Sequence, residues 1–277
     1  MKFSRFTRFS KTVSWLWLVS LAATVSVPLI WVALSTFKES NDIIGAPFKL
    51  PTSFNLENII GAWEQADFGR LYINSAFITL IAVTGILIIY GFAAYAFAKM
   101  KFRGMAFLFI LFIAGQLIPV QAILIPSALQ MSAFGLSDTL LSLILQYLSW
   151  APFAILFLRA AFLAVPQDLE DSARLDGANI VTILFRIVLP MTKSAFATIA
   201  TIYSLWIWND FLFPLIYIRS SELFTVPLGL AQFQGNFTTF WGYLVGAIFV
   251  SVGPPLLIYV LLSRQIQEKL SFAGIKG

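Results

Sequence analysis

Long apolar runs separated by short charged segments dominate the chain. No Asp, Glu, Lys or Arg occurs in residues 12–37, 71–98 or 104–137. A helix rises 1.5 Å per residue, so about 20 apolar residues cross a hydrocarbon layer of about 30 Å. The pattern therefore predicts an all-α integral membrane protein.

Six membrane-spanning helices are predicted, near Val13–Leu34, Ile73–Ala98, Met105–Leu129, Leu140–Phe162, Ala195–Tyr217 and Trp241–Leu262. A basic start before the first apolar run is also typical of a signal peptide. The uncharged stretch 12–37 is too long for that, and no clear small-x-small cleavage site follows it, so we expect a retained first span. The predicted parts are an N-terminal segment 1–12, a transmembrane domain 13–263 and a tail 264–277.

The distribution of basic residues predicts the orientation. With the N-terminus in the cytoplasm, the inner segments 1–12, 99–104, 159–193 and 264–277 hold 14 of the 18 Lys and Arg residues. The outer segments hold the other 4. Basic residues concentrate on the cytoplasmic side of membrane proteins. We therefore expect both termini, and the segment 165–190, in the cytoplasm.

The segment 165–190 is the longest charged interruption, and its residues predict two short helices. Pro166 suits a first helical position, and acids in the first turns favour a helix start. Gly177 is a natural stop because it tolerates the left-handed conformation. Asn179 can cap a second helix that ends before Pro190, which cannot continue it. The charged residues are Asp168, Glu170, Asp171, Arg174, Asp176 and Arg186.

Composition narrows the classes of function. The chain is 59% hydrophobic and 11% charged, whereas soluble proteins have about 25% charged residues. It contains no Cys or His, which excludes disulfides, thiol chemistry, zinc sites and His-dependent catalysis. The sequence has no GxxxxGK[ST] motif, so any ATP must bind to a partner. The net charge of +5 reflects membrane orientation, and no binding of nucleic acid is expected.

The pattern Asp171-Ser172-Ala173, three residues, Gly177, nine residues, Ile187-x-Leu189-Pro190 resembles the EAA loop of binding-protein-dependent ABC importer permeases. It departs from that consensus at Asp171, where Glu is usual, and at Ser172, where Ala is usual. In that family the loop inserts into a cleft on a cytoplasmic ATPase. The resemblance implies that the coupling residues are Glu170, Asp171, Ser172, Ala173, Arg174, Asp176, Gly177, Ile187, Leu189 and Pro190.

Further motifs resemble the carbohydrate subfamily, of the maltose-importer inner-membrane type. They are Ala93–Ala98 with Phe102-Arg103-Gly104, Pro119 and Pro126, Trp208-Asn209-Asp210-Phe211 with Pro214-Leu215, Leu56-Glu57-Asn58, Asn74-Ser75, and Gly274-Ile275-Lys276-Gly277. The resemblance implies half of a transmembrane pathway in the inner membrane. The implied partners are a second related permease, two copies of an ATPase subunit that binds ATP and Mg, and an extracytoplasmic solute-binding protein. No cofactor or metal is expected on this chain itself, and it is not expected to be an enzyme.

Asp210 is the one acid within a predicted span, and an intramembrane carboxylate normally faces the bundle interior or water. Either Asp210 braces a helix junction or it contacts the solute, and both interpretations stay open. Candidate pathway-lining residues are Asn209, Asp210, Trp206, Gln116 and Gln121. Gln146 and Asn236 are further candidates, although buried amides are often interhelical hydrogen-bond partners.

Three alternative functions remain at this point. The same architecture could import a polyol or a glycerol phosphodiester. An ion-driven secondary transporter would predict an internal repeat and more intramembrane ionisable groups, and we find neither. A membrane enzyme lacks a candidate catalytic site in this sequence.

Overall fold

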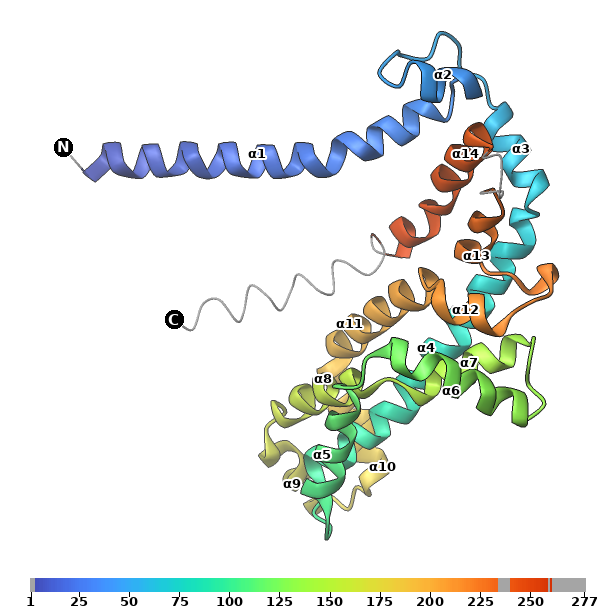
Figure 1. The fold of residues 1–277 in the computed structure, drawn as a ribbon. Helices are drawn as coiled ribbons and strands as arrows, with labels where there is room; N and C mark the ends of the chain where they lie inside the picture. The colour runs from blue at the N-terminus through green and yellow to red at the C-terminus, as the bar shows by residue number, and fades with distance from the viewer. Residues whose placement is uncertain (1–2, 234–239, 259, 261–277) are drawn as a thin grey trace. The chain divides into compact units, whose positions relative to one another are not determined.

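The computed structural model describes residues 3–233, 240–258 and 260. Throughout these residues the chain is helical and contains no β-strand (Figure 1). The all-α prediction is therefore confirmed for this part of the chain. Two compact units are distinguished: Met1–Phe68 with Leu230–Val252, and Gly69–Gly229 with Gly253–Gly277.

The described part of the first unit includes the α-helices α1 (Phe3–Ser35), α2 (Ser40–Gly45), α3 (Glu57–Gln65) and α14 (Trp241–Ser251), and α14 packs against the other three. Close approach of α3 and α14 depends on Gly246, since a Cβ there would lie 2.3 Å from the carbonyl oxygen of Asn58. The buried Asn58 amide donates to the carbonyl oxygens of Thr36 and Lys38, at 2.9 and 2.7 Å. The segment after α1 is thereby held to α3.

The second unit begins with the long helix α4 (Phe68–Lys99) and continues through shorter ones: α5 (Met105–Gly115), α6 (Val120–Ala133), α7 (Leu140–Ser149), α8 (Pro152–Leu163), α9 (Gln167–Leu175), α10 (Ile180–Ile183), α11 (Leu189–Trp208), α12 (Leu212–Tyr217) and α13 (Val226–Leu230). α8 packs against α5 and α11, and α12 packs against α6 and α7. The core includes fully buried Ile78, Ile86, Leu143, Leu158, Phe162 and Ile199.

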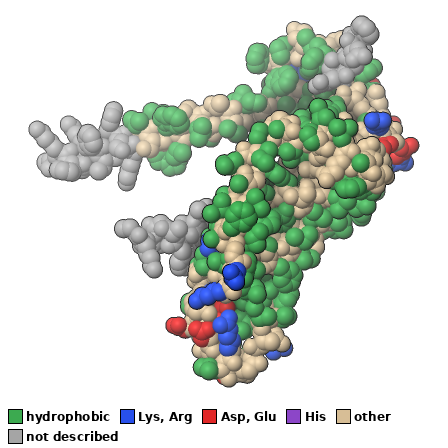
Figure 2. Space-filling model, turned by 60° about the horizontal axis from the view of Figure 1, so that its bottom comes forward, with side chains coloured by type: hydrophobic (Ala, Val, Ile, Leu, Met, Phe, Trp, Pro, Cys, Tyr) green, Lys and Arg blue, Asp and Glu red, His purple; other side chains and the backbone are tan. Residues whose placement is uncertain are grey.

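Much of the apolar surface is not used for internal packing. Among the described residues, four helices are long and apolar enough to cross a membrane, or up to six if each of two bent pairs is one span. Figure 2 shows broad areas of hydrophobic side chains on the face in view, with Lys, Arg, Asp and Glu gathered in small groups. Trp15 and Trp17 of α1 are both 67% exposed. These surfaces fit contact with lipid or another membrane protein.

Two predicted spans are bent pairs and not single helices. The predicted span Met105–Leu129 consists of α5 and α6 at 98°, and Leu140–Phe162 consists of α7 and α8 at 48°. Proline explains both breaks, because it lacks an N–H and disfavours helical conformation in the residue before it. Pro119 occupies the N-cap of α6, and Pro152 lies in the first turn of α8.

The fifth predicted span, Ala195–Tyr217, is also different. A continuous helical run covers Ile180–Trp208, and the chain then breaks before α12. The prediction that Pro190 ends the loop's second helix is wrong. A π turn over Leu184–Val188, in which the Leu189 N–H donates to the Leu184 carbonyl five residues back, precedes the proline. Such a turn interrupts the usual hydrogen-bond ladder. Pro190 therefore lies in the first turn of α11, where its missing N–H does not break the helix, and the helical run continues past it.

Some sequence predictions lie outside the described residues. They concern the end of the sixth span after Val260, the tail 264–277 with its Gly274–Gly277 motif, and Asn236.

Candidate functional site

The segment 165–190 forms the predicted pair of helices at its beginning. α9 ends at Leu175, and Gly177 follows with φ of +84°, in the left-handed region that Gly accepts most readily. Asn179 caps α10, since its Oδ1 accepts from the Thr182 N–H at 2.9 Å. The Gly stop and the Asn cap predicted from the sequence are confirmed.

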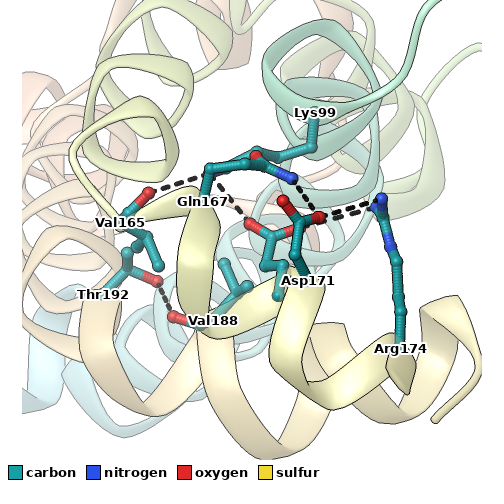
Figure 3. Close-up of polar contacts among 8 residues, drawn as sticks. Lys99, Val165, Gln167, Asp171, Arg174, Val188 and Thr192 are labelled. Carbon is teal, nitrogen blue, oxygen red and sulfur yellow. Dashed lines mark hydrogen bonds and ion pairs between the residues drawn. The ribbon is translucent and has the colours of Figure 1, made fainter. Parts of the chain in front are cut away.

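One acid of α9 is turned into the protein. Glu170 is fully buried, and its Oε1 lies 2.8 Å from the Nζ of Lys99, the last residue of α4. The Lys99 side chain is 6% exposed and also donates to the Val165 carbonyl at 2.9 Å. Figure 3 shows Lys99 extending from α4 to the start of α9. Burial of both charges requires that they stay paired.

The other charged side chains of α9 are exposed. Asp171 accepts from Gln167, four residues before it, at 3.1 Å and from Arg174, three residues after it, at 3.4 Å (Figure 3). Most of the coupling residues predicted from the sequence are exposed, namely Asp171, Ser172, Arg174, Asp176, Gly177 and Pro190. Three are half-buried: Ala173, Ile187 and Leu189. The loop thus has an internal attachment through Glu170 and an outward surface of both charge signs.

Glu170 was predicted as a coupling residue together with the exposed positions, but its side chain is buried, and its Oε2 lies 4.0 Å from the guanidinium of the exposed Arg174. Lys99 was not selected from the sequence. A buried acid requires a cation, but Arg159, Arg174 and Arg186 are nearer to Glu170 in sequence than Lys99 is, and Lys101 and Arg103 lie beside Lys99. The choice among them depends on the tertiary contact.

A second candidate site is a cavity of about 480 Å³ beside the junction of α11 and α12, which we call the α11–α12 cavity. Its walls are Val120, Gln146, Tyr147, Trp150, Tyr203, Leu205, Trp206, Ile207, Asn209, Asp210 and Phe213. All these residues belong to the second unit. Five of the eleven side chains are aromatic, and one is charged.

Asp210 lies in the break between the two helices. Its Oδ2 accepts from the Tyr147 hydroxyl at 2.7 Å, and its Oδ1 accepts from the Leu212 N–H at the start of α12 at 3.0 Å. The carboxylate therefore braces the junction, as one of the two interpretations from sequence proposed, and it also lines the cavity.

The neighbouring polar groups are held in defined positions. The Tyr217 hydroxyl donates to Gln146 Oε1 at 2.8 Å, and Asn209 Nδ2 donates to the Leu205 carbonyl at 2.8 Å. Trp206 is 57% exposed, and its ring contacts those of Tyr203 and Phe153 with centroids 5.4 and 6.4 Å apart. The site thus combines oriented amides with a supported indole ring.

Three of the predicted pathway residues, Trp206, Asn209 and Asp210, meet in this cavity. Gln116 and Gln121 do not line it. Both are exposed, in the break between α5 and α6 and in the first turn of α6. Nothing in the sequence was a reason to select Tyr147, Trp150 and Tyr203. In a chain with 44 Phe, Trp and Tyr residues, no sequence signal separates cavity aromatics from lipid-facing ones.

Among the described residues, no group of three or more acids could hold a metal ion.

The motif residues Asn74 and Ser75 have structural roles. Asn74 Nδ2 donates to the carbonyls of Glu222 and Phe224 at 2.8 and 3.0 Å, and Ser75 Oγ accepts from the Val226 N–H at 2.9 Å. Together they hold the segment before α13 to α4.

Comparison with known proteins identifies related chains. Residues 88–269 match the family model described as "Binding-protein-dependent transport system inner membrane component". The chain is 31% identical over 268 residues to the probable ABC transporter permease protein YurM of Bacillus subtilis, covering 96% of this chain and 89% of the relative. It is 32% identical over 270 residues to the diacetylchitobiose uptake system permease protein NgcG of Streptomyces coelicolor, covering 96% and 88%.

A third relative is the galactooligosaccharides transport system permease protein GanQ of Bacillus subtilis, 29% identical over the whole of this chain and 99% of the relative. Among solved structures, a chain of a bacterial ABC transporter involved in the import of the acidic polysaccharide alginate superposes with a TM-score of 0.83. It is 22% identical, and the match covers 93% of this chain and 96% of that one. At this identity the superposition establishes a shared fold.

Proposed function

Because this chain belongs to the family of binding-protein-dependent transport system inner membrane components, we propose that it is a permease subunit that forms half of the pathway for a sugar or sugar derivative in an ATP-driven importer. The 165–190 loop is its attachment to the ATPase. This assignment rests on the difference in burial between side chains of α9. Glu170 is buried against Lys99, whereas Asp171 and Arg174 are exposed and accessible to a partner. A loop that only connects two spans has no need of a buried ion pair.

The proposed complex has four kinds of subunit. A second related permease completes the pathway, two copies of an ATPase bind ATP and Mg in the cytoplasm, and a solute-binding protein delivers the solute outside. The proposed topology has six spans within residues 13–263, and it places the segments 1–12 and 264–277 in the cytoplasm. The basic residues counted along the sequence support that orientation.

A carbohydrate is the proposed class of solute. The names of the relatives include the uptake of diacetylchitobiose and the transport of galactooligosaccharides and arabinooligosaccharides. Family membership favours this function over an ion-driven secondary transporter, and these relatives favour a sugar over a polyol or a glycerol phosphodiester. The chain itself is a transport subunit and carries out no ATP hydrolysis in this proposal.

Reconstitution tests the proposed function. The chain is extracted from its native membrane in mild detergent, copurifying proteins are identified by mass spectrometry, and the complex is placed in liposomes with its binding protein. We expect an ATPase and a second permease, and ATP-dependent uptake of a labelled oligosaccharide. A chain that purifies alone and still transports its solute contradicts the proposal.

Docking of the ATPase is tested with one charge reversal on α9. Asp171→Lys places a positive charge on the exposed surface, and we expect the ATPase to be lost from the purified complex. Glu64→Lys makes the same change at an exposed position of α3 and is expected to retain it. Equal retention in the two variants contradicts an ATPase contact at Asp171.

A further inference from the structure

We propose that the α11–α12 cavity is a binding site for one ring of a neutral saccharide, so that this chain itself contacts the transported solute. This inference rests on the proposed function, and it assigns a location and a chemistry to the solute contact.

The size and walls of the cavity suit a sugar ring. Its volume of about 480 Å³ lies within the range of about 300–1,000 Å³ typical of small-molecule sites. Tyr147, Trp150, Tyr203, Trp206 and Phe213 supply aromatic surface, against which the apolar C–H face of a sugar ring packs. Trp206 is the best placed for this, because it is more than half exposed and is supported from its own chain by Tyr203 and Phe153.

Hydrogen-bonding groups converge on the same space. An ionised carboxylate accepts about four hydrogen bonds; those of Asp210 include the Tyr147 hydroxyl and the Leu212 N–H, and its place in the cavity wall makes it available to a ligand hydroxyl. Gln146 accepts through Oε1, so its amide nitrogen remains as a donor. Asn209 donates through Nδ2, so its oxygen remains as an acceptor. A hydroxylated ring uses both kinds of group.

The occupant is a saccharide and not a lipid chain or an apolar helix of the second permease. A carboxylate and two amides facing a hydrocarbon occupant would lose their hydration with nothing to replace it, which is costly. A saccharide hydroxyl replaces the lost water directly. The polar groups therefore favour an occupant that carries hydroxyls.

The charge of the walls selects a neutral ring. Asp210 is the only charged residue among those that line the cavity, and no Lys or Arg accompanies it. A carboxylate or phosphate on the solute would face Asp210 without a compensating cation, and like charges in such surroundings repel strongly. Neutral oligosaccharides are therefore expected to bind, and acidic ones are not.

The absence of cysteine from the sequence allows a direct test of occupancy. Asn209→Cys places one thiol of this chain at the cavity in the complete importer. Its rate of reaction with a cationic methanethiosulfonate is compared with and without millimolar diacetylchitobiose, galactobiose, arabinobiose or an alginate disaccharide. The complex with the unaltered chain gives the background from other subunits.

We expect a neutral saccharide that the complex imports to slow the reaction at least fivefold, and the acidic disaccharide to have no effect. Glu64→Cys, at an exposed position of α3, is expected to react at the same rate throughout. In uptake assays Trp206→Ala is expected to raise the apparent KM at least tenfold, Trp206→Phe much less, and Trp17→Ala not at all.

The outcomes separate this inference from the proposed function. Import of a saccharide without protection of the Asn209→Cys thiol overturns the cavity as a binding site and leaves the transport function standing. Protection by the acidic disaccharide as strong as by a neutral one overturns the charge argument. A complex that imports a polyol but none of the saccharides overturns both the site and the proposed function.

Discussion

Lys99 and Glu170 form a buried ion pair, with Nζ and Oε1 2.8 Å apart and side chains 6% and 0% exposed. The pair joins the last residue of α4 to the middle of α9. Because the Lys99 ammonium also binds the Val165 carbonyl, the turn that leads into α9 is held at the same point. A displacement of α9 by an ATPase would therefore act on α4 as well as on the helices directly joined to the loop.

Removal of the cation should be strongly destabilising. In Lys99→Met the buried Glu170 carboxylate keeps only the Arg174 guanidinium, 4.0 Å from its Oε2, and removal of one partner of a buried ion pair typically costs up to about 3–5 kcal/mol. We expect a lower midpoint of thermal unfolding in detergent and less solute transported per ATP hydrolysed. Lys101→Met removes the same charge from an exposed neighbour and should change neither quantity.

The double variant Lys99→Met with Glu170→Leu separates the two effects. An apolar pair of similar size often replaces a buried ion pair without loss of stability, so the unfolding midpoint should recover. If Lys99→Met behaves like Lys101→Met in both assays, the ion pair contributes nothing to the attachment of α9.

Gly177 should be required for coupling because of its backbone conformation. A Cβ at this position meets no atom within 4 Å, but φ is +84°, and the left-handed region costs residues other than Gly about 1–2 kcal/mol. Gly177→Val should therefore shift the turn between α9 and α10 and lower uptake relative to ATP hydrolysis in reconstituted liposomes.

Gly135 provides the matched control for this prediction. It also has a positive φ, +71°, and open space around its Cβ position, but it lies after α6. Gly135→Val should carry the same backbone cost and leave the ratio of uptake to ATP hydrolysis unchanged. An equal loss of coupling in both variants would attribute the effect to stability alone.

Gly246 should tolerate no side chain, for a steric reason. A Cβ would lie 2.3 Å from the Asn58 carbonyl oxygen, which is backbone and cannot rotate away. Overpacking of this kind costs about 1–3 kcal/mol, so Gly246→Ala should lower the midpoint of thermal unfolding. Gly45→Ala, in the same unit with nothing within 4 Å of its Cβ position, should not. Equal midpoints would mean that α3 and α14 pack less closely than described.

Asp138 should make stability depend on pH in the acidic range. Its carboxylate accepts from the Ser220 hydroxyl at 2.5 Å and from the Ser220 and Arg219 N–H groups at 3.0 and 2.8 Å. These hydrogen bonds, that of the Ser220 side chain foremost, hold the pKa of Asp138 below its usual value of 3.8. A depressed folded-state pKa stabilises the protein above the unfolded pKa, and that contribution is lost as the pH falls through the folded value.

The test compares unfolding midpoints of the unaltered chain and Asp138→Asn between pH 6 and pH 3. The two midpoints should differ most near pH 6 and converge below about pH 4. Asn tolerates the left-handed φ of +56° at this position, so backbone strain does not confuse the comparison. A constant difference across this range would contradict a role for the ionised carboxylate.

Local sequence was enough to predict the class of protein and, within the 165–190 loop, the stop at Gly177 and the cap at Asn179. Apolar runs of membrane length, the Gly177 stop and the Asn179 cap act through neighbouring residues only, so they can be read without a fold. The bends were harder to predict. Pro119 and Pro152 break their helices, whereas Pro190 is accommodated by a π turn, and residue type does not distinguish these outcomes.

Tertiary structure alone decided which side chains meet. Glu170 and Asp171 are adjacent acids, yet one is buried against Lys99 and the other is exposed, because successive helical positions point about 100° apart and only packing determines which direction faces inward. In the same way, Asp210 meets Tyr147 and Gln146 meets Tyr217 across more than 60 residues of sequence. Contacts at that separation depend on how whole helices pack, and no local pattern specifies them.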